Sequence, residues 1–420
     1  MEQGSFIEVA PESHFPIQNL PYGIFSPADG SDRRPGVAIG EWVADLAALE
    51  ASGLLTTRDL FNETTLNRFM AAGTSTWSAV RTRLKNLLAA DNPILRDDSY
   101  LRQQVFHPID NVTMHLPAQI GDYTDFYSSR EHATNVGAMF RSRESALLEN
   151  WLYLPVAYHG RASSIVVSGT DIRRPFGQMK VEDEQSPQFG PSQKMDFELE
   201  VGYFIGGGNS LGQPIPVDEA SDHVFGLVLV NDWSARDIQA WEYRPLGPFL
   251  GKNLGTTISP WIVPLEALAP FACEPPNQDP APLPYLTSDK RTTYDIHLEV
   301  RLEREADEGS HVITRSNFKY LYWTIAQQVA HHTITGCNLR SGDLLATGTI
   351  SGPTPDSSGS MLELAWGGKR PLQFPDGDTR SFLADGDRVT LTGWCQGNGY
   401  RVGLGECSGM LLPAHDPPSE

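Results

Sequence analysis

The residues of this sequence best suited to chemistry are acidic, and two of them, Glu198 and Glu200, lie two positions apart. Successive side chains of a β-strand point to opposite faces. A strand here would therefore place both carboxylates on one face and Phe197 and Leu199 on the other. Two like charges in that position need a counter-charge.

Two further carboxylates stand in equally unusual settings. Asp125 lies between aromatic residues in Gly121–Tyr127, and Asp232 follows the apolar run Val224–Val230 after one intervening residue. Neither a cysteine nor a pair of histidines lies near these carboxylates. A ligand set made only of oxygen atoms suits Ca²⁺, Mg²⁺ or Mn²⁺ better than zinc. We therefore predict an enzyme built around a divalent metal ion.

A base and its partner are harder to identify from the sequence. His132 follows Asp125 by seven residues, so one loop could bring a base and a metal ligand to the same cavity, although a surface histidine beside a turn is the plainer alternative. Glu363 lies in a strand-like run, Ser360–Trp366, and its charge needs a partner if it points inward. A histidine is an economical partner, because a carboxylate at one ring nitrogen makes the other a better base.

Polar and cationic residues follow the strand that ends near Asp232. We expect a helix between Asn231 and Tyr243, with Ser234 as its N-cap and Asp237 in the capping-box position. Three of its residues recur at helical spacing on a face that is either a binding surface or simply solvent-exposed: Arg236, Gln239 and Tyr243. The glycine-rich loop after this helix could bring oxygen atoms to an ion and leave an ammonium group free, through Lys252 and Thr256.

The elements that must position these residues differ along the chain. The first hundred or so residues mix short strands with two predicted helices, Thr76–Ala90 and Ser99–Phe106, and the rest reads as short strands with one clear helix, Tyr320–His332. We therefore expect two domains, residues 1–117 and 118–420, in a mainly β protein with some α-helix. Pro270–Pro284 is expected to form a long surface loop.

Composition excludes several classes of partner. With 32 basic and 52 acidic residues the net charge is −20, which repels nucleic acid and anionic membrane surfaces. An acidic substrate would need a local basic pocket. The four cysteines have no CxxC spacing, and no apolar run approaches the roughly 20 residues needed to cross a bilayer. These features predict a soluble protein of the cytoplasm.

Four long motifs carry a resemblance to a known family. With the acidic and basic residues above in this order, the sequence resembles the fumarylacetoacetate hydrolase family, from Phe15 to Arg401. The motifs are Gly121–Arg130, Tyr158–Ile165, Asn231–Ile238 and Pro245–Lys252.

The resemblance implies a fold, a reaction and an assembly. The fold would be a small SH3-like N-terminal barrel followed by a larger β-sandwich roll, and the working unit a homodimer. The reaction would be hydrolysis of the carbon–carbon bond of 4-fumarylacetoacetate, a diketone dicarboxylate, to fumarate and acetoacetate at the end of tyrosine and phenylalanine breakdown. A divalent ion would chelate the diketone and stabilise the enolate released on cleavage.

The same resemblance assigns roles residue by residue. His132 would be the general base, Glu363 its orienting carboxylate, and the groups that stabilise developing negative charge Arg236, Gln239 and Lys252. Ca²⁺ or Mg²⁺ would be bound by Asp125, Glu198, Glu200 and Asp232, with a second Mg²⁺-type site at Asp232, Lys252 and Thr256. The substrate contacts would be Tyr127, Arg141, Tyr158, Gln239, Tyr243 and Thr349.

Two alternatives remain at this stage. A relative that decarboxylates or isomerises another β-diketo acid would keep the metal carboxylates but need neither His132 nor Glu363. A Ca²⁺-stabilised binding module without turnover would leave both the base and the cations unused.

Overall fold

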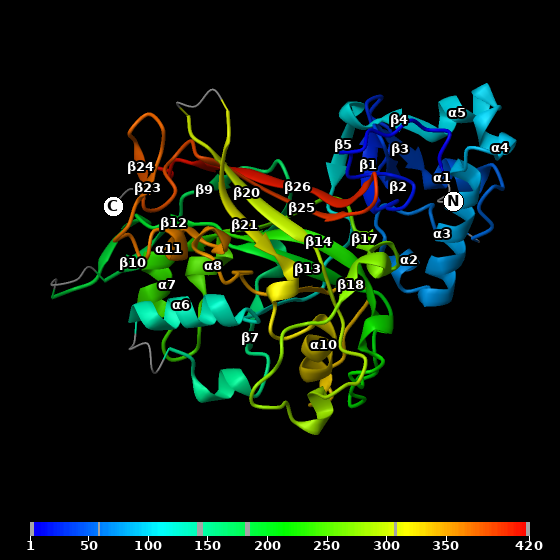
Figure 1. Ribbon diagram of the computed structural model, residues 1–420. Coiled ribbons are helices and arrows are strands. Elements are labelled where there is room, and N and C mark those ends of the chain that lie inside the picture. The colour runs from blue at the N-terminus through cyan, green and yellow to red at the C-terminus, as the bar shows by residue number, and fades with distance from the viewer. Residues whose placement is uncertain (1–3, 58, 141–145, 181–184, 306–308, 417–420) are drawn as a thin grey trace.

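Three sheets of five or more strands organise the molecule (Figure 1). The structure is a computed structural model, and it describes residues 4–416 apart from 58, 141–145, 181–184 and 306–308. Within these ranges, no helix combines the length and the apolar character that a membrane span requires.

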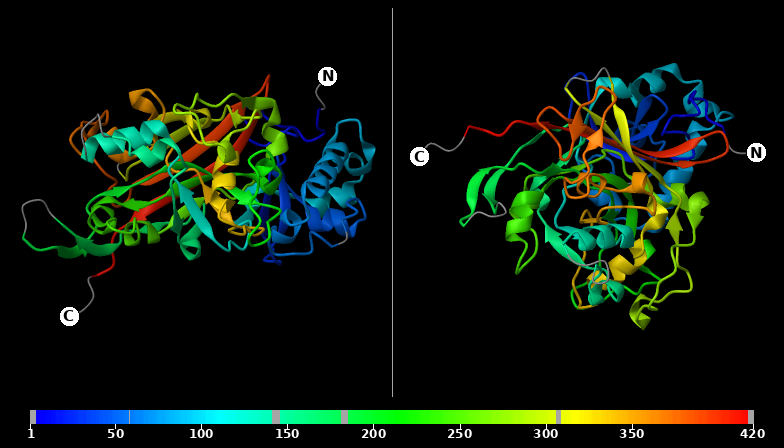
Figure 2. Two further views of the ribbon diagram at one scale, coloured as in Figure 1. Left: turned by 90° about the horizontal axis from the view of Figure 1, so that it is seen from below. Right: turned by 60° about the vertical axis from the view of Figure 1, so that its left-hand side comes forward.

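The first sheet is antiparallel and barrel-like, and it lies at one end of the molecule in Figure 1 and in the left view of Figure 2. Its strands, in spatial order, are β4 (Phe106–Pro108), β3 (Trp42–Asp45), β2 (Arg34–Ile39), β1 (Tyr22–Pro27) and β5 (Val112–His115). The helices of this part are α1 (Leu46–Ala51), α2 (Asn67–Met70), α3 (Thr74–Leu88), α4 (Pro93–Arg96) and α5 (Ser99–Val105). The two predicted helices are thus α3 and α5, and α3 buries its apolar face through Trp77, Val80, Leu84 and Leu87.

The second sheet has eight strands and carries most of the candidate site. Its main path runs through β7 (Ala157–Gly160), β6 (Tyr123–Phe126), β22 (Leu344–Ala346), β13 (Leu199–Ile205), β14 (Val224–Asp232), β16 (Thr256–Ile258) and β8 (Ile165–Val167). Strand β17 (Val263–Pro264) pairs with β14 off this path.

The third sheet packs against the second and forms the sandwich. Its strands, in spatial order, are β21 (His311–Asn317), β20 (His297–Glu303), β25 (Arg388–Gln396), β26 (Arg401–Leu412) and β9 (Ile172–Arg173). Leu227 and Leu229 of β14 share a core with Leu298, Leu391 and Leu411 of this sheet. The predicted fold class, a mainly β protein with a small N-terminal barrel and a larger β-sandwich roll, is confirmed.

Smaller elements surround the sandwich. The short ribbons pair β10 (Phe176–Met179) with β11 (Gln188–Pro191), β12 (Met195–Asp196) with β15 (Ser234–Ala235), β18 (Ala272–Cys273) with β19 (Thr293–Tyr294), and β23 (Leu372–Gln373) with β24 (Thr379–Arg380). The remaining α-helices are α6 (Arg130–Phe140), α7 (Arg236–Glu242), α8 (Leu250–Asn253), α9 (Leu265–Leu268), α10 (Ile325–Thr333) and α11 (Met361–Leu364).

Two segments differ from the sequence-based expectation. Helix α10 begins at Ile325 rather than near Tyr320, because Thr324 and Gln327 form a capping box at that point. The proline-rich segment, expected to be only loop, contains β18, and its Gln278 exchanges amide hydrogen bonds of 3.0 and 2.9 Å with Gln327 of α10. The segment is therefore tied to the helix beneath it.

The two faces of β14 belong to different cores. Leu227 and Leu229 point into the sandwich, whereas Val228 and Val230 lie in a second core that continues into the N-terminal sheet and its helices. Alternation along the strand produces this division, because every second residue faces the same way. The face that meets the N-terminal part is also the face on which Asp232 lies at the end of the strand.

Candidate active site and metal centre

Four carboxylates predicted as metal ligands come together: three lie in strands of the second sheet, and Glu198 directly precedes β13. Each contributes an oxygen atom, and these atoms all lie within 4.8 Å of one another. The four residues are buried, with exposed fractions of 0–5%: Asp125, Glu198, Glu200 and Asp232.

Neighbouring strands explain why residues so distant in sequence meet. Asp125 lies in β6, Glu200 in β13 and Asp232 at the end of β14. Strand β22 runs between β6 and β13, and its Ala346 pairs with both Asp125 and Gly202.

The surroundings of these carboxylates fit a bound cation. Both side-chain oxygens of Glu200 lack a hydrogen-bond partner among the described residues. Burial, followed by the charges of Asp125 and Asp232, raises the pKa of Glu200 well above its usual value, and burial with the charge of Asp232 does the same to the pKa of Asp125. Unpaired buried carboxylates are costly, and a divalent ion with oxygen ligands is the group that would pair them.

Two cations complete the other side of the cluster. Arg236 Nη2 lies 2.8 Å from Glu198 Oε1, and Lys252 Nζ contacts Glu198 and lies 2.6 Å from Asp232 Oδ2. Burial opposes ionisation of Glu198, but the charges of Arg236, Lys252 and then His132 hold its pKa far below the usual range. Two basic side chains thus lie among the carboxylates, and Glu198 contacts both of them.

Asp232 is held by two hydroxyl groups as well. Thr256 Oγ1 donates to Asp232 Oδ1 at 3.0 Å, and Tyr158 Oη donates to Oδ2 at 3.1 Å. The predicted second-site residues, Asp232, Lys252 and Thr256, thus lie in direct contact.

His132 and Glu363, which the sequence could not pair, are hydrogen-bonded. His132 lies in α6, and its Nδ1 is 2.6 Å from Glu363 Oε2. Burial opposes ionisation of Glu363, but the charge and hydrogen bond of His132, with donors from Asn135 and Ser351, bring its pKa below the usual value. An ionised carboxylate only accepts, so Nδ1 is the ring nitrogen that donates to Glu363, and Nε2 is the nitrogen that does not contact it.

Local structure departs from expectation at three of these residues. Glu363, predicted on a strand, lies in α11, because the Ser360 side chain caps that helix. Lys252, predicted in a loop, lies in α8. Ser234 does not cap α7: it pairs within β15, the N-cap is Ala235, and Asp237 instead accepts hydrogen bonds from Ser192 and Gln193.

Only some of the predicted substrate contacts lie beside the site. The Tyr127 ring lies edge-on to His132 with centroids 5.3 Å apart, and Gln239 Oε1 accepts a hydrogen bond of 3.2 Å from Arg236. Thr349 is buried after β22, whereas Tyr243 is 40% exposed at the end of α7. Arg141 lies outside the described residues.

Sequence reasoning missed the residues that hold Glu363 and Arg236. Asn135 Nδ2, Ser351 Oγ and Ser360 Oγ each donate to Glu363 at 2.9 Å. Asp196, fully buried, accepts a hydrogen bond of 2.8 Å from Arg236 Nε. The two-residue period that marked Glu198 and Glu200 also reaches Asp196, and this was the available signal.

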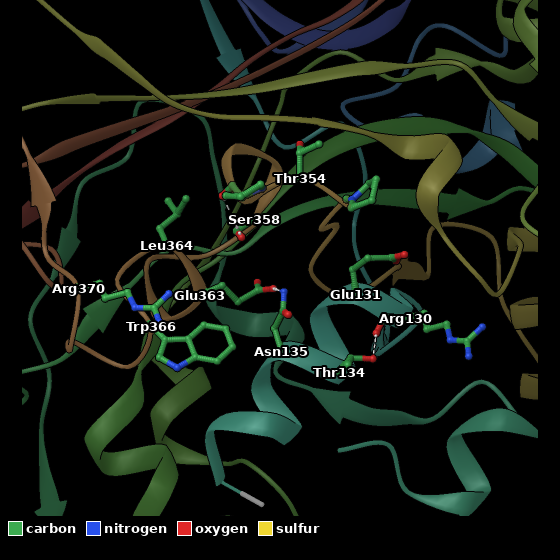
Figure 3. A pocket seen from close by; sticks show the side chains of 13 residues that line it. Arg130, Glu131, Thr134, Asn135, Thr354, Ser358, Glu363, Leu364, Trp366 and Arg370 are labelled. Atoms are coloured by element: carbon green, nitrogen blue, oxygen red, sulfur yellow. Dashed lines mark hydrogen bonds between the residues drawn. The ribbon is translucent and has the colours of Figure 1, made fainter. Parts of the chain in front are cut away.

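A cavity of about 520 Å³ lies beside Glu363 and not around the metal ligands (Figure 3). Figure 3 shows Asn135 directed at the Glu363 carboxylate, with Trp366 and Arg370 on the other side. The cavity is thus bordered by the carboxylate that orients the histidine.

Comparison with known proteins agrees with the geometry. The family models described as fumarylacetoacetase N-terminal and fumarylacetoacetate hydrolase C-terminal match residues 18–117 and 122–409. The chain is 57% identical to the fumarylacetoacetase of Homo sapiens, over 98% of this chain and 99% of the relative. It is also 57% identical to that of Arabidopsis thaliana, over 99% of both.

A solved structure shares the fold. It is the fumarylacetoacetate hydrolase from Exiguobacterium antarcticum, 18% identical, with a TM-score of 0.51 over 94% of this chain and all of that one. Both family models and relatives identical at more than half of their positions show that the chain belongs to the fumarylacetoacetase family of hydrolases.

Proposed function

We propose that this hydrolase cleaves the carbon–carbon bond of 4-fumarylacetoacetate with water, giving fumarate and acetoacetate, as the last step of tyrosine and phenylalanine breakdown. The relatives named fumarylacetoacetase support the substrate. The observation that carries the proposal is the buried hydrogen bond between His132 and Glu363 beside four carboxylates. A decarboxylase or isomerase would not need a base prepared to activate water.

His132 acts as the general base. Glu363 fixes the imidazole through Nδ1, so Nε2 removes a proton from water as the oxygen attacks the carbonyl next to the fumaryl group. The same imidazolium then returns the proton to the CH₂ carbon that leaves, which becomes the methyl carbon of acetoacetate. Proton transfer of this kind contributes about 10² to 10⁴ in rate.

Arg236, Gln239 and Lys252 stabilise the oxyanion that forms when water adds. The positive charges of Arg236 and Lys252 are held in place by Glu198 and Asp232, so little reorganisation is needed as the negative charge appears. Removing one such donor costs about 10² to 10³ in rate.

Asp125, Glu198, Glu200 and Asp232 are the proposed ligands of Ca²⁺ or Mg²⁺. A bound ion would act as a Lewis acid, which polarises the diketone oxygens and stabilises the negative charge that forms on the leaving group. Asp232, Lys252 and Thr256 form the proposed second Mg²⁺-type site, in which the hydroxyl of Thr256 and the carboxylate offer the oxygens.

The substrate dicarboxylate is proposed to contact Tyr127, Arg141, Tyr158, Gln239, Tyr243 and Thr349. The positions of Tyr127 beside His132 and of Gln239 beside Arg236 support this set. Cationic and phenolic groups are the donors that two carboxylates require.

The proposed working form is a cytoplasmic homodimer without nucleic-acid or membrane partners. Four unpaired cysteines and a net charge of −20 support this setting. Residues 1–117 and 118–420 are the proposed domains, and the first sheet, which ends at His115, supports the division.

A direct assay tests the function. Purified protein is incubated with fumarylacetoacetate, with and without a chelator, while the diketone absorbance is followed. We expect rapid loss of absorbance, suppressed by chelator and restored by added Mg²⁺ or Ca²⁺. Protein that holds the ion yet leaves the diketone intact would refute the proposal.

A further inference from the structure

Asp196 is a buried carboxylate that the mechanism above does not use. Its exposed fraction is 0%, and it lies in β12, two residues before Glu198. Oδ2 accepts hydrogen bonds from Arg236 Nε at 2.8 Å and from the backbone N–H of Leu362 at 3.0 Å. Oδ1 accepts the backbone N–H of Met361 at 2.7 Å. One side chain therefore joins a cation of the site to the helix that carries Glu363.

The two backbone donors are the first of α11. The opening N–H groups of a helix have no partner within it. Asp196 accepts the first two, and Ser360, the N-cap, accepts the third from Glu363 at 3.3 Å. The same Ser360 hydroxyl donates to the Glu363 carboxylate at 2.9 Å. The start of α11 and the direction of Glu363 are thus fixed together.

Backbone pairing strengthens the attachment from the same side. The N–H of Leu199 donates to the carbonyl of Gly359 at 2.8 Å, and Glu198 forms an isolated β-bridge with Ser360. On another side, Glu363 and Trp366 border the 520 Å³ cavity (Figure 3), and the Glu363 side chain is hydrogen-bonded to His132, Asn135 and Ser351. The segment that presents Glu363 is therefore attached on one side to the residues around Asp196 and Glu198 and on the other to His132 and Asn135 of α6.

We propose that Asp196 is a positioning residue of the reaction: it holds Arg236 and the first turn of α11 at a fixed separation, so that the oxyanion-stabilising cation and the base His132 meet one substrate carbonyl. The inference rests on the proposed hydrolysis and deepens it. Misplacement of a reacting group by about 1 Å costs about 10² in rate. Asp196 does not touch the substrate, and its effect passes through Arg236 and Glu363.

The test uses Asp196→Asn in the full chain. The amide keeps one acceptor but turns the other oxygen into a donor, which opposes donors already present on Arg236, Met361 and Leu362. We expect kcat per folded site to fall about 10²-fold while KM changes by less than about threefold. Because both substitutions act on the positioning of His132, we expect kcat of the double variant Asp196→Asn/Glu363→Gln to be little lower than kcat of Glu363→Gln alone.

A matched control separates positioning from stability. Asp45 is also fully buried, caps a helix by accepting the N–H of Ala48 at 2.9 Å, and pairs with Arg34 at 3.1 Å, but it lies in the N-terminal part. Asp45→Asn should lower the melting temperature and leave kcat per folded site unchanged. Equal losses of kcat in both variants would make Asp196 an ordinary structural residue.

A spectroscopic readout is independent of turnover. The Nδ1 proton of His132, assigned by its loss in His132→Ala, should resonate at low field in the wild-type NMR spectrum and shift in Asp196→Asn but not in Asp45→Asn. An unshifted proton, or kcat within about threefold of wild type, would overturn the proposal.

Two further outcomes, a variant that does not fold and an inactive wild-type protein, also have a defined meaning. If Asp196→Asn does not fold, Asp196→Glu, which keeps the charge and moves it by one methylene, must show the same fall in kcat and the same proton shift. Wild-type protein without activity would refute the hydrolysis alone, because the NMR comparison still decides whether Asp196 positions the histidine.

Discussion

Glu363 shows how one residue can set the protonation of another. Burial alone would favour a neutral carboxyl, but His132, Asn135 and Ser351 hold its pKa below the usual value. The ionised carboxylate requires a donor from His132, and the imidazole is thereby fixed in one tautomer. A base that is oriented before the substrate arrives needs no rearrangement during the reaction.

Replacing His132 by Ala removes the proposed base and leaves all four proposed metal ligands in place. We expect kcat to fall by at least about 10³-fold, while binding of Mg²⁺ or Ca²⁺ by calorimetry stays near the wild-type value. His297→Ala, an exposed histidine stacked on Trp394, is the control and should retain full activity. Near-normal turnover in His132→Ala would remove it from the role of base.

A second prediction concerns the metal ligands and how the stability of the protein depends on pH. The pKa values of Asp125 and Glu200 are raised by burial and then by neighbouring carboxylates, so without an ion the folded state keeps protons that the unfolded state has released. The stability of the chelated protein therefore falls as pH rises above the unfolded value of about 4. Added ion should raise the melting temperature more at pH 8 than at pH 5.5.

Glu200→Gln checks this assignment, because it removes one titrating ligand. Its melting temperature should depend less on pH after chelation and rise less on addition of ion. Glu299→Gln is the matched control, since Glu299 is buried but paired with Arg301 in the third sheet. Identical metal responses in both variants would contradict the ligand set.

Much of the site at the residue scale could be predicted from sequence. Acidic residues placed in or directly after apolar strands marked Asp125, Glu200 and Asp232, because burying such charges requires a reason. Asp196 could not be assigned in the same way. Its partners are backbone N–H groups of residues 361 and 362, and only the folded chain brings those groups to it.

At the scale of elements, Gly348 shows how closely segments approach behind the cluster. It has φ +77°, and a Cβ there would lie 2.1 Å from the carbonyl oxygen of Phe126, the neighbour of Asp125. Only glycine meets both demands, since left-handed backbone disfavours other residues and the strand carbonyl leaves no space.

Gly348→Ala should destabilise the protein by about 3 kcal/mol and weaken ion binding, because β6 must shift. Gly399→Ala is the matched control: its φ is +80°, but a Cβ would have nothing within 4 Å, so only the backbone strain of about 1 kcal/mol remains. Urea unfolding and ion titration of both variants measure the difference. Equal stability losses would show that contact with Phe126 is unimportant.

The secondary structure predicted for α11 and for the start of α7 was wrong, although both lie beside the carboxylate cluster. The mostly apolar run around Glu363 was interpreted as a strand, but the hydroxyl of Ser360 and the carboxylate of Asp196 satisfy the first N–H groups of a helix there. Ser234 has the composition of an N-cap, yet pairing with Asp196 keeps it extended. In both cases a partner from a distant segment decided the local structure, and sequence windows do not contain it.

At the scale of the whole molecule, the long helix α3 was predictable because its apolar residues recur at helical spacing, whereas the barrel and the sandwich roll were expected only from the family resemblance. The core that the N-terminal part shares with the second sheet could not be predicted. Phe204, Phe225 and Val228 of the second sheet pack in the same core as Phe61, Phe69 and Leu84 of the N-terminal part. Apolar runs in a sequence show that a strand is buried, but not which partner covers each face.

The shared core predicts one cooperative unfolding transition despite two family domains. Scanning calorimetry of the ion-loaded protein should give a single peak whose calorimetric and van't Hoff enthalpies agree. Separation of the halves would expose the apolar face of β14, so neither is expected to melt alone. Two resolved peaks would contradict this coupling.

Strand β14 has a wider consequence, because it ends in Asp232 while Val228 and Val230 touch the N-terminal core. A ligand that binds only the native state lowers the population of every opening that disrupts its site. Occupancy at one end of the strand should therefore slow amide hydrogen exchange far away, in β1 and β2, wherever exchange requires the two parts to separate.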